Sequence, residues 1–371
     1  MHRNWLVVAL AVVCVWAPGS SRGAAAAQGG RTMRLKRVSS VDRQGMRTEA
    51  FSLLVPMGWT FRGGVFWPLQ NPAMPANCAF TVTSGNSFER LECFPSGAHF
   101  WSTNRMLLSN FPPGSKYLGS EVRAPMSPAD YLRQVVIARN RNNVGQLRVV
   151  DARPLPKLAR QLARAQQASP GAQSSAAAAK VRVEYNQVGF AVEEEFYCVI
   201  ETYSFPVRTL YGVTTSTNWT ASYVFSFKAP KGHLAGNAER FWVMIRSFRI
   251  NPQWFNKYQQ VINTLVQQKI REIRHIGQIS RIIAQTNDEI SDMMMRSYQQ
   301  RSAVYDRLAD QFSQYIRGVD AYYDPVNQRR VDLPAGYDRG WTNGLGEYVL
   351  TDDPNFNPNL DSNQNWTPMR R

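Results

Sequence analysis

The chain has 371 residues, 44% of them hydrophobic, and its 43 lysine and arginine residues against 27 acidic ones give a formal net charge of +16. A charge of this sign favours anionic partners such as acidic polysaccharide, anionic lipid or nucleic acid. Beyond the N-terminus there is no apolar run of the roughly twenty residues that a membrane-spanning helix needs, which excludes a helical transmembrane protein.

The N-terminus has the features of a secretory signal peptide. A short basic start precedes the apolar run Trp5 to Ala17, and the small residues Ala25 to Ala27 offer a cleavage site. At about thirteen residues, the apolar run is too short to cross a bilayer. We therefore expect residues 1–27 to be removed and a soluble mature chain to be secreted or held in the periplasm or cell envelope. Residues 28–47 are rich in arginine and are expected to form a flexible basic arm.

Cys78 and Cys93 flank a predicted β-hairpin. Between them, Gly85 and Asn86 suit a two-residue turn, which would place Cys78 directly opposite Cys93. In a secreted chain this arrangement predicts a disulfide between them, with two buried free thiols as the alternative. Cys198 lies in an apolar run and is expected to be a buried core thiol.

Residues 48–250 are predicted to form an antiparallel sheet domain with flanking helices. Runs of aromatic and β-branched residues alternate with Gly and Pro, which is typical of strands and turns. Ser127 followed by Pro128 predicts the start of a helix. A low-complexity insert at 153–180 separates two β-rich blocks, and it is either a short basic amphipathic helix on a tether or a solvated loop.

Two segments resemble the PsbP-like α/β sandwich superfamily. The run FSLLVPMGW, Phe51 to Trp59, resembles its opening strand, and FWVMIRSF, Phe241 to Phe248, resembles its closing strand. The resemblance covers residues 48–250, while the insert, the segment after residue 250 and the C-terminal part depart from the pattern. It implies a non-catalytic domain that docks on larger assemblies, and no ligand residue is carried over from it.

Neither a catalytic motif nor a metal-binding motif is recognisable. After residue 27 the histidines are His99, His233 and His275, and none has metal-ligand spacing to another histidine or a cysteine. Of the three adjacent carboxylates, Glu193 and Glu195 share a strand face, where contact with solvent or with arginine is favoured over an acid/base pair. We therefore expect a protein that is not an enzyme and that uses no cofactor.

Residues 251–320 contain two glycines and one proline and are predicted to form one helix of roughly 100 Å. Its apolar stripe is narrow, which favours pairing with another helix in a coiled coil and formation of a homo-oligomer. The residues of this seam are Ile262, Val266, Ile270, Ile273, Ile276, Ile279, Ile283, Tyr305, Leu308, Phe312, Tyr315 and Val319. Because cap-like residues occur at Thr286 to Glu289, an antiparallel helical hairpin is an equal alternative.

Residues 321–371 are predicted to form a small β unit followed by a polar tail rich in Asn and Pro. Oxygen donors at every second position of the tail suggest a weak calcium site, made by Asp353, Asn355, Asn357, Asn359 and Asp361. No glycine makes the sharp turn of a calcium loop and no glutamate ends it, so a polar tail without metal is favoured.

Taken together, these patterns predict an α+β protein: an antiparallel sheet domain with flanking helices, a long helix or helical hairpin, and a small C-terminal β unit. The expected function is that of a secreted, non-catalytic binding or scaffold protein of the cell envelope or extracellular space. It would dock on an unidentified protein partner through its sheet domain. Binding of an anionic envelope polymer, anionic lipid or nucleic acid is one alternative, and an enzyme with an unrecognised site is another.

Overall fold

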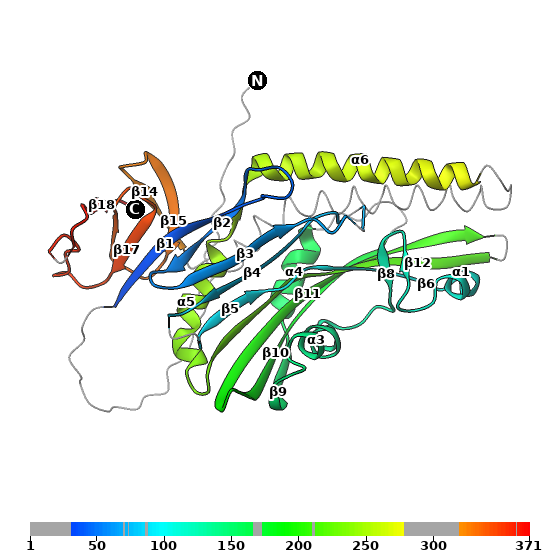
Figure 1. Ribbon diagram of the computed structural model, residues 1–371, viewed down its shortest axis with the longest axis horizontal. Helices are drawn as coiled ribbons and strands as arrows, with labels where there is room; N and C mark the ends of the chain where they lie inside the picture. The colour runs from blue at the N-terminus through cyan, green and yellow to red at the C-terminus, as the bar shows by residue number, and fades with distance from the viewer. Residues whose placement is uncertain are drawn as a thin grey trace, which may run out of the picture.

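A computed structural model of the chain describes residues 31–69, 71–72, 74–85, 88–165, 173–209, 212–277, 319–360 and 362–371. Strands account for 50% of the structure and helices for 21%. The predicted α+β class is therefore wrong, because the chain is mainly β and builds large curled sheets (Figure 1).

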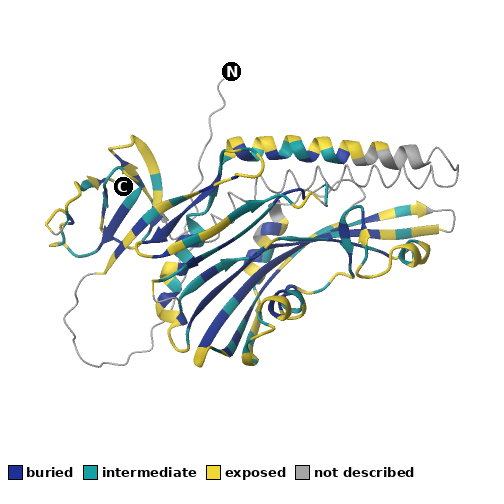
Figure 2. Ribbon diagram, viewed as in Figure 1, coloured by how far each residue is buried: buried dark blue, intermediate teal, exposed yellow. Residues whose placement is uncertain are grey.

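The larger sheet has ten strands in the order β3-β4-β5-β12-β11-β10-β9, with β6, β7 and β8 added beside β12. The strands are β3 (Thr60–Phe66), β4 (Asn77–Thr83), β5 (Arg90–Cys93), β6 (Gly97–Ser102), β7 (Lys116–Tyr117), β8 (Ser120–Val122), β9 (Gly145–Pro154), β10 (Gln173–Gln187), β11 (Phe190–Thr209) and β12 (Gly212–Pro230). The hairpin of β10 and β11 turns at Val188 and Gly189, both with positive φ, as a type I′ turn requires. The three long strands β10 to β12 are buried along much of their length (Figure 2).

A second sheet joins the two ends of the described chain, in the order β13-β2-β1-β17-β16-β18. Its strands are β1 (Thr32–Val41), β2 (Glu49–Pro56), β13 (Arg249–Ile250), β16 (Arg339–Thr342), β17 (Glu347–Thr351) and β18 (Thr367–Met369). A separate two-stranded sheet is formed by β14 (Val319–Asp324) and β15 (Arg329–Pro334). Leu35 of β1 is fully buried between Pro56 and Tyr348. The predicted flexible arm therefore contains a strand, because β2 and β17 pair with β1 on both sides.

Helices cover both faces of the larger sheet. They are α1 (Arg105–Asn110), α2 (Pro128–Tyr131), the π-helical turn η1 (Leu132–Ile137), α3 (Ala138–Asn140), α4 (Pro156–Ala165), α5 (Leu234–Arg246) and α6 (Pro252–Gly277). The α2 face lies under α2, η1 and α3 and includes Phe196, whereas the α5 face lies under α4, α5 and α6 and includes Tyr197. Among the described helices, none is both long enough and apolar enough to cross a membrane.

Ser127 caps α2 by accepting the N–H of Asp130 at 3.1 Å, and Pro128 occupies the first turn, so the predicted helix start is confirmed. The low-complexity insert contains α4 and the beginning of β10. Leu158 and Leu162 of α4 are buried against the sheet, which explains why leucines recur among its basic residues.

The predicted long helix or helical hairpin over residues 251–320 is not seen. Helix α6 ends at Gly277, and residues 278–318 lie outside the described part of the chain. The predicted coiled coil is also wrong, because the apolar stripe packs on the protein's own core: Trp254, Tyr258, Ile262 and Val266 are all buried there. Of the other seam residues, Ile270, Ile273 and Ile276 lie in α6, Val319 opens β14, and Ile279, Ile283, Tyr305, Leu308, Phe312 and Tyr315 lie outside the described residues.

The predicted disulfide is wrong, since Cys78 and Cys93 are free thiols. Phe80, and not Cys78, pairs with Cys93 because the connection between β4 and β5 is two residues longer than predicted. Ser84 closes it by donating its N–H to the carbonyl of Glu89 at 2.9 Å. Cys78 pairs instead with Val65 of β3. The contact with Cys93, together with burial, raises the pKa of the Cys78 thiol.

Asp42 fastens the start of α6 to the sheets. Its buried carboxylate accepts the indole N–H of Trp254 at 2.8 Å, the indole N–H of Trp67 at 3.0 Å, and the backbone N–H groups of Gly45 at 2.8 Å and Met46 at 3.1 Å. Burial opposes the charge, but these four donors together lower the pKa of Asp42 below its ordinary value. One carboxylate thus joins the β1–β2 loop, the end of β3 and α6.

We expect Asp42→Ala to lower the free energy of unfolding by about 3 kcal/mol, because it leaves two indole N–H groups and two backbone N–H groups buried without an acceptor. Urea unfolding followed by tryptophan fluorescence measures the loss. Asp338→Ala removes an exposed carboxylate and is the matched control, expected to change stability by less than about 0.5 kcal/mol. Equal effects of the two substitutions would show that Asp42 does not hold the structure together.

Candidate functional site

Charged side chains gather on the α2 face at one end of the larger sheet. Arg90 of β5 pairs with Lys228 of β12, which pairs in turn with Glu194 of β11, so the three lie in one row across the sheet. Glu92 lies two residues from Arg90 on the same strand face. Arg141, which follows α3, reaches this row from the covering helix. We call Arg90, Glu92, Arg141, Glu194 and Lys228 the buried charge cluster.

Glu194 is fully buried and holds the cluster together. Its carboxylate accepts bonds from Arg141 Nε at 2.8 Å and Nη2 at 2.6 Å, from the Tyr185 hydroxyl at 2.7 Å and from the Ser226 hydroxyl at 2.6 Å. Burial alone would raise the pKa of Glu194, but the bonds and charge of Arg141, aided by the two hydroxyls, outweigh it and lower that pKa. Glu194 is therefore an ionised carboxylate with a structural partner at each oxygen.

Arg141 links Glu194 to a second carboxylate and to two aromatic rings. Its Nη2 also donates to Glu92 at 2.8 Å, and its guanidinium lies 5.8 Å from the ring centre of Phe94 and 5.5 Å from that of Phe196. The rings exclude water from the ion pair and add cation–π attraction. The π-helical turn η1 immediately precedes α3, and such turns often occur where a helix positions a functional residue.

Lys228 has no matching carboxylate among the described residues. It is 6% exposed, and its Nζ donates to Oε1 of Gln187 at 3.0 Å, with no ion pair to any described residue. Burial lowers the pKa of Lys228. Arg90 Nη2 lies 3.5 Å from Glu92, but Arg90 Nε is buried and bonds to nothing among the described residues. With three cations and two carboxylates, the cluster keeps one unbalanced positive charge.

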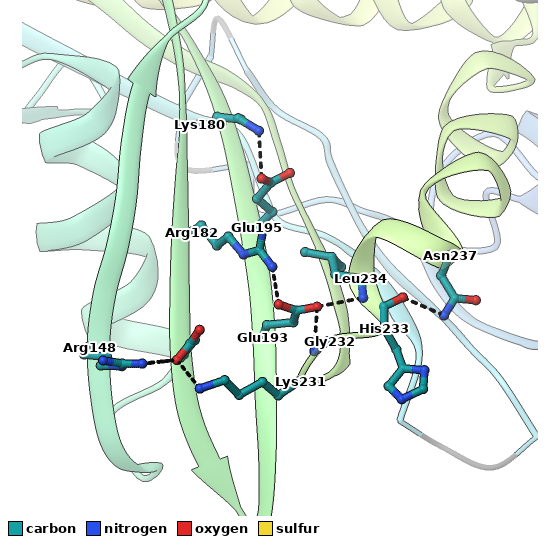
Figure 3. A network of polar contacts seen from close by, with 11 residues as sticks. Arg148, Lys180, Arg182, Glu193, Glu195, Lys231, Gly232, His233, Leu234 and Asn237 are labelled. Atoms are coloured by element: carbon teal, nitrogen blue, oxygen red, sulfur yellow. Dashed lines mark hydrogen bonds and ion pairs between the residues drawn. The ribbon is translucent and has the colours of Figure 1, made fainter. Parts of the chain in front are cut away.

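On the α5 face, the neighbouring carboxylates also have structural partners (Figure 3). Glu193 forms an ion pair with Arg182 and accepts the N–H of Leu234 at 2.7 Å, at the start of α5. Glu195 pairs with Lys180 at 2.7 Å. Both carboxylates are thus engaged with basic side chains, which is the alternative that the sequence favoured over an acid/base pair.

His99 is a second buried ionisable group on the α2 face. Its ring stacks on Trp219 at 4.0 Å and meets Tyr131 edge-on at 5.6 Å, while neither ring nitrogen has a hydrogen-bond partner among the described residues. Burial lowers the pKa of His99 from 6.5 to about 4, although the Glu121 carboxylate 3.4 Å away opposes the shift. His99 is therefore a neutral, packed ring at neutral pH. The other histidines lie elsewhere, His233 before α5 and His275 in α6.

The weak calcium candidate in the C-terminal tail uses its oxygens locally. Asp353 accepts the N–H of Asn355 at 2.9 Å, Asn357 accepts the N–H of Asn359 at 3.0 Å, and Asn359 accepts the N–H of Trp366 at 2.7 Å. Asp361 lies outside the described residues. Within the described ranges, no group of three or more His, Cys, Asp or Glu side chains could hold a metal ion.

The exterior carries mostly positive charge. Exposed arginines occur throughout the described chain, from Arg31 in the first segment to Arg371 in the last, whereas the exposed acidic residues that the structure describes are Glu239, Asp332 and Asp338. The remaining described carboxylates are buried or half-buried. The exposed surface of the described residues is therefore mainly basic.

One part of that surface combines arginine with an exposed aromatic ring. Tyr323 of β14 pairs with Arg330 of β15 on one side and with Arg370 on the other, so the three residues share a face. Tyr323 is 44% exposed, and neither arginine has an ion pair with any residue in the described part of the chain. We call these residues the Arg–Tyr–Arg row. Tyr322, its neighbour, is buried, so of the two tyrosines one covers the core and one is free for contact.

No known protein family matches the chain, and neither does any curated protein. The resemblance of residues 48–250 to the PsbP-like superfamily therefore stays a prediction.

Neither the buried charge cluster nor the Arg–Tyr–Arg row was predicted from the sequence. In the run Phe225 to Lys228, polar residues alternate with aromatic ones, which indicates two differently used strand faces. That alternation could have shown that Ser226 and Lys228 share a face. It could not have shown that Arg90 and Arg141 lie against them, because those contacts depend on strand order and on the covering helix.

We expect Arg141→Met and Glu194→Gln each to lower the free energy of unfolding by about 3 kcal/mol, since each leaves a buried charge or amide without its partner. The double variant is expected to lose less than the sum, with a coupling of about 1–3 kcal/mol. Urea unfolding of the four proteins measures the cycle. Arg139→Met, at an exposed position on the same helix, is the control. Strictly additive losses would contradict a direct interaction.

We also expect His99 to make stability depend on pH. As pH falls below about 6.5 the unfolded chain protonates this histidine, but the folded chain does so only near pH 4, so stability is lost as pH decreases through this window. The total loss is about 3 kcal/mol. In His99→Phe, which keeps the stacked ring, urea unfolding at pH 7, 5.5 and 4.5 should show a loss smaller by that amount. His233→Gln, at an exposed position, should behave as the unaltered chain does. A His99→Phe variant with undiminished pH dependence would refute the assignment.

Proposed function

We propose that the chain is a secreted, non-catalytic binding protein whose partner is an anionic polymer of the cell envelope or extracellular space. The observation that carries this proposal is the outward placement of positive charge: exposed arginines throughout the described chain against three exposed carboxylates. Such a surface attracts a polyanion over several ångströms and raises the rate of encounter. The secreted location rests on the apolar run Trp5 to Ala17, which lies outside the described residues.

The Arg–Tyr–Arg row is the place where the proposal can be tested locally. Two guanidinium groups, neither in an ion pair with a described residue, lie on either side of a half-exposed phenol ring. They can bond sulfate, phosphate or carboxylate groups, while the ring packs on the face of a sugar or base. A non-catalytic role is supported by Glu193, Glu194 and Glu195, which all bond to basic side chains and so are not free to transfer protons.

We expect the full chain to bind heparin with an affinity that falls steeply as sodium chloride rises, because counterions compete with arginine for the polymer. The double variant Arg330→Gln/Arg370→Gln should bind about tenfold more weakly and show a shallower salt dependence. Fluorescence titration at several salt concentrations measures both quantities.

The control Arg105→Gln/Arg139→Gln removes the same charge from exposed positions elsewhere. It should change affinity less than about threefold if contact, and not overall charge alone, decides binding. A chain that fails to bind heparin, dextran sulfate and single-stranded DNA at low salt would overturn the proposal. If the two double variants weaken heparin binding equally, the Arg–Tyr–Arg row is not a specific contact site for the polymer.

A further inference from the structure

The end of the larger sheet combines unbalanced positive charge with exposed aromatic surface. Lys228 and Arg90 are direct neighbours across β12 and β5, although like charges in such positions repel. The Lys228 ammonium has three N–H donors, and a neutral amide, Gln187 Oε1, accepts one of them at 3.0 Å. Arg90 Nε is likewise buried without a bond to any described residue. Both cations thus have unused donors where water has little access.

Aromatic side chains adjoin these donors. Phe190 begins β11 and pairs with Gln187, the acceptor of Lys228, so both lie on the strand face that carries Glu194 and Lys228. Phe190 is 57% exposed, and its ring packs edge-on against Phe88 at 4.9 Å. Phe88 precedes Arg90 by two residues. A large exposed ring beside buried donors is a combination that neither folding nor solubility requires.

We propose that Lys228 and Arg90, with Phe88 and Phe190 beside them, form a binding site for a monocarboxylate that carries an apolar body. The carboxylate would accept bonds from Lys228 Nζ and from Arg90, and the apolar body would cover Phe190. A single negative charge balances the one positive charge that the cluster has in excess. A dianion such as phosphate fits less well, because Glu92 and Glu194 lie in the same cluster and would repel its second charge.

This site goes beyond the proposed function, and the two stand independently. Polyanion binding uses exposed arginines, whereas this site uses the buried Lys228. A polymer could contact Lys228 only by inserting an end group or a side group into the cluster. Heparin affinity should therefore be unchanged in Lys228→Met.

Isothermal titration calorimetry of the full chain with octanoate and with 3-phenylpropionate, below micelle-forming concentrations, tests the proposal. We expect saturable binding with one site for at least one of the two, and the preferred probe shows whether the apolar body is alkyl or aromatic. Acetate, inorganic phosphate, octanol and 3-phenylpropanol should bind at least tenfold more weakly, because each lacks either the apolar body or the single charge.

Lys228→Met should weaken binding at least tenfold, and Phe190→Ala about fivefold. Lys231→Met is the matched control, because Lys231 is exposed, pairs with Glu184 and lies three residues away. It should leave binding unchanged. If Lys228→Met does not fold, Arg90→Met at a third-exposed position provides the same test. The proposal would be overturned if neither carboxylate binds saturably, or if a carboxylate and its matching alcohol bind equally well. It would also be overturned if Lys228→Met and Arg90→Met both bind as tightly as the unaltered chain.

Discussion

The ionised carboxylate of Glu194 is the constraint on which the arrangement of the larger sheet depends. A buried charge is tolerated only where opposite charge and hydrogen bonds replace water, and Glu194 draws these from Arg141, Tyr185 and Ser226. These three residues come from the end of α3, from β10 and from β12, while Glu194 itself belongs to β11. The same four elements must therefore meet at one point. Hydrophobic burial alone is compatible with many arrangements of these strands. The hydrogen bonds and ion pair of Glu194 favour the one arrangement in which all of its partners reach it.

The same requirement shapes the outside of the molecule. Several carboxylates inside or at the edge of the sheets take one or two arginine or lysine side chains, as Glu193 and Glu184 do, whereas Asp42 takes indole N–H groups. Arginine is in excess over these internal needs, and its long side chain places the remaining guanidinium groups in solvent while the stem covers apolar surface. In the part of the chain that the structure describes, the exposed charged side chains are therefore mostly basic.

Local sequence patterns predicted some local structure correctly. They failed where the structure depends on contacts between segments that are distant in the sequence. Ser127 and Pro128 start a helix because a cap needs only its own next turn. The turn at Gly85 and Asn86 was predicted two residues too short, and that error alone moved Cys78 away from Cys93. In α6 the spacing of Ile262 and Val266 was correctly recognised as an apolar stripe. What it packs against depends on β2 and the other core strands, which periodicity does not specify.

The buried charge cluster could not be predicted from the sequence for the same reason. Because the cluster lowers the stability of the fold, we infer that it has a role in binding. Placing Lys228 directly opposite Arg90 lowers stability, and an apolar residue at position 228 would pack against the same neighbours without needing an acceptor. Natural sequences break local rules of this kind mainly where a ligand or partner supplies the missing interaction. At Glu194 the protein itself supplies every partner. At Lys228, among the described residues, it supplies one neutral amide. Glu194 and Lys228 are paired across β11 and β12, so a charge with a structural role lies beside one that retains donors for a ligand.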